Sequence, residues 1–361
     1  MPRIAALTSG GDAPGMNAAL RAVAKVGAAN NVDVAGVEQG FEGLVDGRLV
    51  DLTVRLDEDR VRSDRTVDAA GGLGGTVLGS SRSERFLLEE HRRLAADGLR
   101  SAGVGGLIVI GGNGSAAGAH AFAELFPVVV IPASIDNDVG CTGFSLGVDT
   151  ALNTIVDACD RISDTARAHK RAFIIEVMGR QSGYLAMASA VAAAADAILI
   201  PERHRSEGEI LDAVESVIRT SFEQDRGKRR VLIIKAEGVA YPTTRLTRDV
   251  EARIAEDLPD VAVRATVLGH LVRGGSPTFR DRMIAGRLGL AAVGALGDGA
   301  VDDMVAWEST VAGGVPTPDP FVQRFGLGQV LADTEALLDG SSPVTQRRVK
   351  MTEAIEGVLA L

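Results

Sequence analysis

The chain has 361 residues, of which 46% are hydrophobic and 24% are charged, and its formal net charge is −10. This length exceeds the size at which a single hydrophobic core stops growing, about 250–300 residues, so we expect two domains. The negative charge argues against binding to nucleic acid, and the absence of about 18 consecutive apolar residues argues against a membrane span. The cysteines, Cys141 and Cys159, provide neither a disulfide framework nor a zinc ligand set, so we expect a cytoplasmic protein.

Short apolar runs alternate with helix-like segments along most of the chain. We expect strands at residues 4–8, 32–37, 106–110, 128–131, 173–177, 197–200, 231–236 and 262–267. We expect helices at residues 17–29, 84–97, 116–125, 149–168, 182–195, 207–224 and 247–258, with a short terminal helix after residue 341. Apolar strands that alternate with helices are typical of a parallel sheet covered on both faces. The predicted fold class is α/β, in which ligands lie at the carboxyl ends of the strands.

A glycine-rich loop, Ser9-Gly10-Gly11-Asp12-Ala13-Pro14-Gly15, joins the first expected strand to the first expected helix. Without Cβ atoms, the backbone N–H groups of glycines can approach a ligand closely. The unpaired N–H groups of the following helix N-terminus favour an anion. The loop therefore indicates a phosphate site, although a tight turn without a ligand explains this loop, taken alone, equally well.

Further polar clusters follow the ends of other expected strands. They are Gly111-Gly112-Asn113-Gly114-Ser115, Pro132-Ala133-Ser134-Ile135-Asp136-Asn137-Asp138, Met178-Gly179-Arg180, and the segment from Arg264 to Gly275 that contains His270 and Arg273. The second cluster places two carboxylates within three residues. The two residues could simply end a strand and cap the next helix.

Together with Gly79-Ser80-Ser81-Arg82 and Glu237, these motifs resemble the phosphofructokinase family over essentially the whole chain. The resemblance implies two Rossmann-like three-layer domains with mostly parallel sheets and an active site in the cleft between them. It implies a phosphoryl-donor domain at residues 1–147 plus about 272–322, and a sugar-phosphate domain at residues 148–271 plus about 323–361. The implied reaction transfers the terminal phosphoryl group of ATP to the 1-hydroxyl of fructose 6-phosphate, with Mg²⁺, to give fructose 1,6-bisphosphate.

The resemblance also assigns roles to individual residues. The implied catalytic residues are Asp136, as the base, with Arg82, Arg180, Gly11 and Ser134. The implied sugar-phosphate contacts are Ser134, Ile135, Asp136, Arg171, Met178, Gly179, Arg180, Glu237, Arg264, His270 and Arg273. The implied donor contacts are Gly11, Arg82, Ser83, Gly112, Asn113, Gly114 and Ser115, with Asn113 also at the metal. Arg171 and Arg264 would come from a neighbouring subunit, so we expect a dimer or tetramer.

Two positions favour ATP over pyrophosphate as the donor. The pyrophosphate-using branch of the family typically has Asp at the position of Gly114 and Lys at the position of Ala133. Asn113, however, stands where ATP enzymes usually have an aspartate, so a pyrophosphate-dependent enzyme stays the alternative. A non-catalytic sugar-phosphate sensor is less favoured, because Asp136 and Arg82 are both present. A dinucleotide-dependent oxidoreductase is set aside, because the first loop lacks the G-x-G-x-x-G spacing.

The resemblance also predicts weak regulation by ADP. Arg21, Lys25, Lys228 and Arg229 match basic residues of the family's effector site. Ser163 replaces a phosphate-binding arginine, so we expect this effector site to be incomplete.

Overall fold

The computed structural model of the chain describes residues 3–222, 229–309 and 311–359. The chain forms two compact units: unit 1 comprises Met1–Thr150 and Arg273–Leu337, and unit 2 comprises Ala151–Val272 and Leu338–Leu361. The last division lies later than the expected one near residue 322. The reason is that Val322–Gly326 forms β14, which pairs antiparallel with β12 (Asp302–Trp307) inside the sheet of unit 1.

Unit 1 is built around an eight-stranded sheet with the order β13-β14-β12-β7-β6-β1-β2-β3. Besides β12 and β14, its strands are β1 (Arg3–Ser9), β2 (Val34–Val37), β3 (Leu49–Asp51), β6 (Val104–Gly111), β7 (Val128–Pro132) and β13 (Val315–Pro316). A separate hairpin is formed by β4 (Thr53–Arg55) and β5 (Val61–Ser63). The strands from β12 to β2 are parallel, whereas β3, β13 and β14 are antiparallel additions at the edges.

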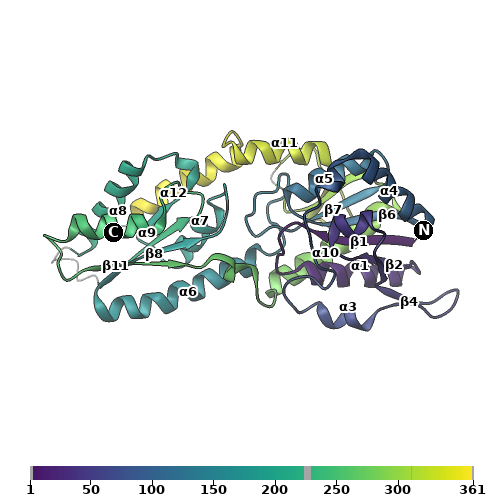
Figure 1. Cartoon of the computed structure of the whole chain (residues 1–361), viewed down its shortest axis with the longest axis horizontal. Coiled ribbons are helices and arrows are strands. Elements are labelled where there is room, and N and C mark those ends of the chain that lie inside the picture. Colours follow the sequence, from purple (N-terminus) through teal and green to yellow (C-terminus); the bar gives the residue numbers. More distant parts are fainter. Residues whose placement is uncertain (1–2, 223–228, 310, 360–361) are drawn as a thin grey trace. The chain divides into compact units, whose positions relative to one another are not determined.

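Helices cover both faces of this sheet (Figure 1). They are α1 (Met16–Ala29), α2 (Gly40–Val45), α3 (Arg65–Ala70), η1 (Arg85–Leu87), α4 (Glu89–Ser101), α5 (Asn113–Ala123), α10 (Phe279–Gly297) and α11 (Leu327–Leu338). Alternate strand residues such as Leu7 and Val109 join an apolar core with α2, α4, α5 and α11. The strand period of two directs the intervening residues to the opposite face. There α1 and α10 pack against each other.

Unit 2 has a four-stranded parallel sheet with the order β11-β8-β10-β9. Its strands are β8 (Arg171–Val177), β9 (Ala197–Leu199), β10 (Arg230–Ala236) and β11 (Ala262–Val267). The other elements are α6 (Val148–His169), which begins in unit 1, α7 (Tyr184–Ala192), η2 (Pro201–Arg203), α8 (Glu207–Phe222), α9 (Thr243–Ile254), η4 (Gly269–Arg273) and α12 (Pro343–Leu359). One face of the sheet shares an apolar core with α8 and α9, while α7 contacts β9 and β10.

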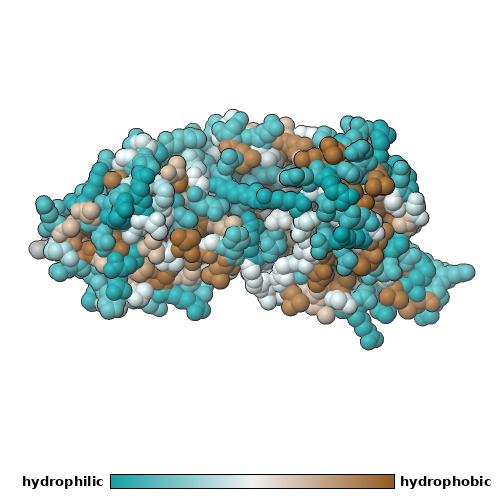
Figure 2. Space-filling view, in the orientation of Figure 1, coloured by the Kyte–Doolittle hydropathy of each residue, from teal (hydrophilic) through white to brown (hydrophobic). Residues whose placement is uncertain are grey.

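Each predicted strand corresponds to an observed one, but some expected helices differ. The segment at residues 84–97 is divided into η1 and α4, because Leu88 has an extended backbone with ψ of 130°. The long helix α10, the inner strand β12 and the strands β13 and β14 at the edge were not predicted. In the part of the chain that the structure describes, no helix is long and apolar enough to cross a membrane. Figure 2 shows hydrophilic groups interspersed with separate apolar patches on the face that it draws.

Candidate active site

Helices α1 and α5 of unit 1 both begin without a side-chain cap at the carboxyl edge of the sheet. Helix α1 starts after Gly15, whose φ is +103°, and α5 starts after Gly112; neither start has a side-chain hydrogen bond to it. By contrast, Asp64 caps α3 and Thr278 caps α10. The strands before α1 and α5 are the adjacent β1 and β6, where the chain turns to opposite sides of the sheet. Ligands of doubly wound sheets bind at such a switch point, and uncapped N–H groups suit phosphate.

Arg273 brings a positive charge to the loop after β1. Its Nη1 donates a hydrogen bond to the carbonyl oxygen of Asp12 at 3.1 Å. A Cβ atom added to Gly11 would lie only 2.8 Å from the same Nη1 atom, so the absence of a side chain at Gly11 lets the guanidinium approach the backbone. The structure thus places Arg273, predicted to bind the sugar phosphate, directly beside Gly11, predicted to bind the donor.

The start of α5 combines open space with a buried amide. A Cβ atom added to Gly114 would meet no atom within 4 Å. Asn113 donates from Nδ2 to the Asp138 carboxylate at 2.8 Å, and its buried Oδ1 has no hydrogen-bond partner. Ser115 is 3% exposed, and a Cβ atom added to Gly10 would lie 3.3 Å from its hydroxyl oxygen. The start of α5 thus has open space beside Gly114. The hydrogen bond from Nδ2 to Asp138 fixes the Asn113 amide, whose Oδ1 has no partner.

The loop after β7 holds the two predicted carboxylates in a buried setting. Asp136 is 4% exposed, and Asp138 accepts a hydrogen bond from the Ser134 hydroxyl at 2.8 Å. Asn137 adopts a left-handed backbone with φ of +48°, and its side chain bonds to the backbone of Gly143 and Ser145. Ile135 is fully buried, so the predicted sugar contact of this residue is restricted to its backbone.

Arg82 and Ser83 lie in an irregular loop before η1. The Arg82 side chain is exposed, whereas the Ser83 hydroxyl donates to Glu42 and accepts from the Phe86 N–H at 3.2 Å. The hydrogen bond from Ser83, followed by that from Arg85, lowers the pKa of Glu42 below its usual value. The Ser83 side chain therefore holds the loop through these two hydrogen bonds.

In unit 2, the predicted sugar residues meet at the ends of β8 and β10. Glu237 Oε1 accepts hydrogen bonds from the N–H groups of Gly179 and Arg180, at 3.2 and 2.8 Å. Met178 is buried, whereas the Arg180 side chain is exposed. His270 is also exposed and lies in η4, which follows β11. The geometry thus brings Met178, Gly179, Arg180 and Glu237 together.

Arg171 and Arg264 do not join this group. Arg171 is the first residue of β8 and pairs in register with Ala262, near the start of β11; Arg264 pairs with Phe173. At about 3.3 Å per residue, Arg171 and Met178 are about 20 Å apart along the strand. Arg264 instead pairs with Glu251 at 3.2 Å.

Sequence reasoning missed Asp281, which fixes the loop between β7 and α6. Asp281 is fully buried and accepts hydrogen bonds from the N–H groups of Gly147 and Thr150, at 3.0 and 2.9 Å. Burial raises the pKa of this carboxyl, against the effect of these hydrogen bonds. The spacing Thr278-Phe279-Arg280-Asp281 is that of a helix capping box, a signal that could have revealed the start of α10.

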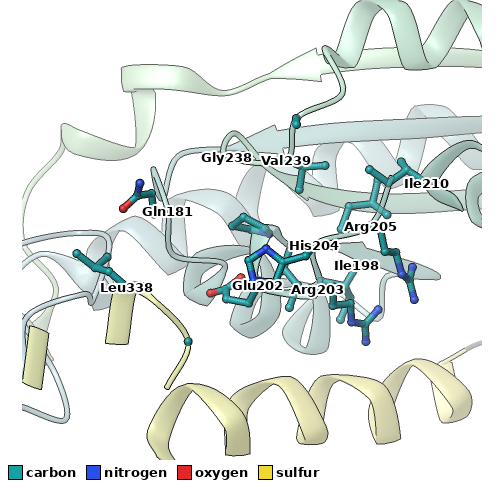
Figure 3. A pocket seen from close by; sticks show the side chains of 15 residues that line it. Gln181, Ile198, Glu202, Arg203, His204, Arg205, Ile210, Gly238, Val239 and Leu338 are labelled. Atoms are coloured by element: carbon teal, nitrogen blue, oxygen red, sulfur yellow. The ribbon is translucent and has the colours of Figure 1, made fainter. Parts of the chain in front are cut away.

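A separate cavity of about 390 Å³ lies beside Gln181 and Gly238 in unit 2 (Figure 3). Glu202, at its wall, accepts a hydrogen bond from Gly183 N–H at 2.6 Å, and burial raises the pKa of its carboxyl. Arg203 pairs with Glu356 of α12. None of the residues that line this cavity belongs to the predicted catalytic or binding set, so the cavity is distinct from the candidate site.

Comparisons with known proteins identify the family of this chain. A family model described as Phosphofructokinase matches residues 3–296. The ATP-dependent 6-phosphofructokinase of Thermotoga petrophila is 46% identical over 320 residues, which cover 88% of this chain and 93% of that protein. The protein of the same name from Thermotoga neapolitana is 46% identical over 342 residues, which cover 94% of this chain and 100% of that protein.

Solved structures show the same fold. The phosphofructokinase of Saccharomyces cerevisiae matches with a TM-score of 0.81 and 28% identity over 99% of this chain, which spans 50% of the yeast chain. The pyrophosphate-dependent phosphofructokinase of Marinobacter aquaeolei matches with a TM-score of 0.74 and 21% identity, over 91% of this chain and 84% of that chain. On the family match and the near full-length similarity to the Thermotoga proteins, this chain belongs to the phosphofructokinase family.

Proposed function

We propose that this protein is an ATP-dependent 6-phosphofructokinase, which transfers the terminal phosphoryl group of ATP to the 1-hydroxyl of fructose 6-phosphate. The observation that carries the choice of donor is the open space at Gly114, at the uncapped start of α5. Glycine there leaves room for the α-phosphate of a nucleotide, whereas an aspartate would repel it. Ala133, which is 1% exposed, supplies no ammonium to hold pyrophosphate.

In this proposal, the reaction depends on positioning and charge neutralisation. Asp136 accepts the proton of the sugar hydroxyl as the oxygen attacks the terminal phosphorus of the donor. Arg82 neutralises charge that develops on the transferred group, and the N–H groups of α1 and α5 hold the donor phosphates. Met178, Gly179, Arg180 and Glu237 orient the sugar, and His270 and Arg273 hold its phosphate.

Asn113 and a neighbouring carboxylate offer oxygen atoms that could bind Mg²⁺. Mg²⁺ prefers oxygen ligands and usually keeps several waters while it binds substrate phosphates. The unpaired Oδ1 of Asn113 and the carboxylate of Asp138 are such ligands. Among the described residues, no group of three His, Cys, Asp or Glu side chains could hold a metal by itself. Bound Mg²⁺ would neutralise donor charge, with phosphate oxygens as its main ligands.

The test of the proposal compares donors in one assay. Purified protein with fructose 6-phosphate and Mg²⁺ is given ATP or pyrophosphate, and fructose 1,6-bisphosphate formation is followed through aldolase. We expect kcat/KM to be much higher with ATP than with pyrophosphate. A higher value with pyrophosphate would assign the chain to the alternative donor class. Binding of fructose 6-phosphate without turnover would instead favour the sensor.

Changing Asn113 to Asp should make the protein dependent on Mg²⁺ for stability. The variant replaces the hydrogen bond from Nδ2 to Asp138 with two carboxylates in contact, and losing such a charge-assisted bond costs about 1.5–3 kcal/mol. We expect a lower thermal midpoint than wild type in EDTA and a larger rise on addition of Mg²⁺. Asn113→Ala is the control, because it loses the bond without adding charge. An equal Mg²⁺ response in all three proteins would exclude a metal contact at this position.

The proposed active unit is at least a dimer, because Arg171 and Arg264 lie far from the sugar group of their own chain. Asp136→Asn and Arg264→Ala subunits should each be nearly inactive alone. When they are unfolded and refolded together, hybrids should regain activity, because one site combines an intact Asp136 with the neighbour's Arg264. As the control, either single variant is refolded with the double variant Asp136→Asn/Arg264→Ala, and these hybrids should stay inactive because no site has both residues. Light scattering at the assay concentration gives the mass of the active species. A fully active monomer, or hybrids that recover no activity, would contradict the shared site, and both arginines would then have to act within their own subunit.

We expect weak or absent activation by ADP and nearly hyperbolic saturation by fructose 6-phosphate. Asp68 already engages Lys25 at 3.0 Å and Arg21 at 3.8 Å, so a nucleotide must compete with a carboxylate for these cations. Ser163 is 4% exposed and offers no charge, while Lys228 lies outside the described residues. Saturation curves with and without ADP test this expectation. A sigmoidal curve that becomes hyperbolic with submillimolar ADP would contradict it.

A further inference from the structure

Lys235 is an unexpected residue in the interior of unit 2. It follows Val-Leu-Ile-Ile in β10 and is only 1% exposed. Val231 and Ile233, on the same face of the strand, belong to the apolar core with α8 and α9. Lysine is almost never fully buried unless it is paired, and burial of its charge carries a large desolvation cost. An apolar side chain would fill this position at a lower cost, so packing alone does not account for the lysine.

The ammonium of Lys235 is held by a group on the neighbouring strand. Its Nζ lies 3.0 Å from Glu176 Oε2 and donates to the carbonyl oxygen of Ala236 at 3.4 Å. The Thr243 hydroxyl, from the first turn of α9, donates to the same Glu176 oxygen. The contact joins β10, β8 and α9 through one carboxylate.

This contact lies directly beneath the predicted sugar-binding residues. Lys235 and Glu176 are register partners in the parallel β10–β8 pair. Each stands two residues before a predicted sugar residue: Glu237 directly follows β10, and Met178 directly follows β8. Glu176, Lys235, Thr243 and Glu237 also line one cavity of about 450 Å³. The positive charge of Lys235 thus lies at the wall of a cavity that Glu176 and Glu237 also line, where it lowers the repulsion between their two negative charges.

The loops above the contact require firm support. Arg180 has a left-handed backbone with φ of +48°, and Gly179 has φ of +145°. Such conformations persist only where the surroundings over-determine them. The Glu237 carboxylate supplies part of this support through its bonds to Gly179 and Arg180 N–H. A Cβ added to Gly238 would lie 1.9 Å from the Arg180 carbonyl oxygen, so the two loops fit tightly.

We propose that Lys235, acting through Glu176 and Thr243, is a positioning residue that holds Glu237 and the Met178–Gly179–Arg180 loop in their sugar-binding geometry. It therefore sets the affinity for the sugar phosphate and leaves the donor half of the reaction unaffected. This inference rests on the proposed function.

The test measures fructose 6-phosphate binding by calorimetry, together with kcat and both KM values, in Lys235→Met. This change keeps the length of the side chain and removes its charge. We expect fructose 6-phosphate binding to weaken about tenfold, while KM for ATP and kcat at saturating sugar stay within about twofold of wild type. Lys350→Met, at an exposed position of α12, is the matched control and should match wild type.

Two more variants separate positioning from plain stability. Lys235→Met with Glu176→Gln leaves no unpaired buried charge, so its thermal midpoint should recover relative to the single variant. Its sugar affinity should stay low, because the charged contact is absent. Glu176→Gln alone removes the carboxylate but keeps an oxygen that can accept from the Lys235 ammonium, so it should show an intermediate loss of affinity, and it keeps the test valid if Lys235→Met does not fold.

Two results would overturn the inference. The first is a folded Lys235→Met whose sugar affinity is within about twofold of wild type; if this variant does not fold, the same result in Glu176→Gln counts instead. The second is a double variant that regains both sugar affinity and thermal stability. Failure of the proposed function would appear differently, as a wild-type protein that neither binds nor phosphorylates fructose 6-phosphate.

Discussion

Asp136→Asn is expected to lower kcat by about 10²- to 10⁴-fold, the usual contribution of a general base. The amide keeps the size of the side chain but cannot accept the proton of the attacking hydroxyl. Asp136 is 4% exposed in a loop held by Asn137, so the substitution should leave the backbone unchanged. Because the proton is transferred only as the hydroxyl attacks, fructose 6-phosphate binding should stay within about threefold of wild type.

Rapid-quench measurement of a single turnover checks this result, because it reports the chemical step separately from product release. Asp51→Asn, an exposed aspartate on β3, is the matched control and should retain full activity. If Asp136→Asn keeps a near-normal kcat, the base is another group, with Asp138 as the next candidate. A variant that loses sugar binding and kcat together would indicate a structural role for Asp136.

Gly114→Asp should lower kcat/KM for ATP by about 100-fold or more, the scale of losing a well-placed electrostatic contact. The new carboxylate would stand in the first turn of α5, among the N–H groups that we propose hold the donor phosphates. A Cβ atom at this position meets no atom within 4 Å, and an acidic residue near a helix N-terminus is favourable, so folding should not suffer. The loss is therefore expected in donor use alone.

Gly114→Asn is the matched control, because it has the same shape without the charge and should lose much less. Thermal unfolding checks that all proteins are folded, and kinetics with pyrophosphate check whether the small donor is spared. Unchanged ATP kinetics in Gly114→Asp would remove the physical basis for the choice of donor. An equal loss in Gly114→Asn would assign the effect to crowding instead of charge.

The sequence alone determined the fold class, the order of the strands along the chain and the position of the loops that we propose carry the chemistry. These features are local: an apolar run with the period of a strand favours an extended backbone, and a glycine where a helix begins permits a positive φ, whatever the rest of the chain does. The predicted strand at residues 262–267 coincides with β11, and the predicted helix at residues 17–29 differs from α1 by one residue. The strands β13 and β14 lacked such a signal, because their place in the sheet depends on pairing: β14 pairs with β12, and β13 pairs with β14.

Only the tertiary structure decided which of these residues contact each other and which have their side chains buried in the core. Arg273 contacts the loop that contains Gly11, although the two lie far apart in the sequence. Lys235 contacts Glu176 because the two residues are register partners in adjacent strands. Ile135, within a predicted sugar motif, has its side chain in the core. Such outcomes depend on which face of each strand is buried and which strands become neighbours. Both are set by the burial of apolar surface over the whole unit, which no local pattern encodes.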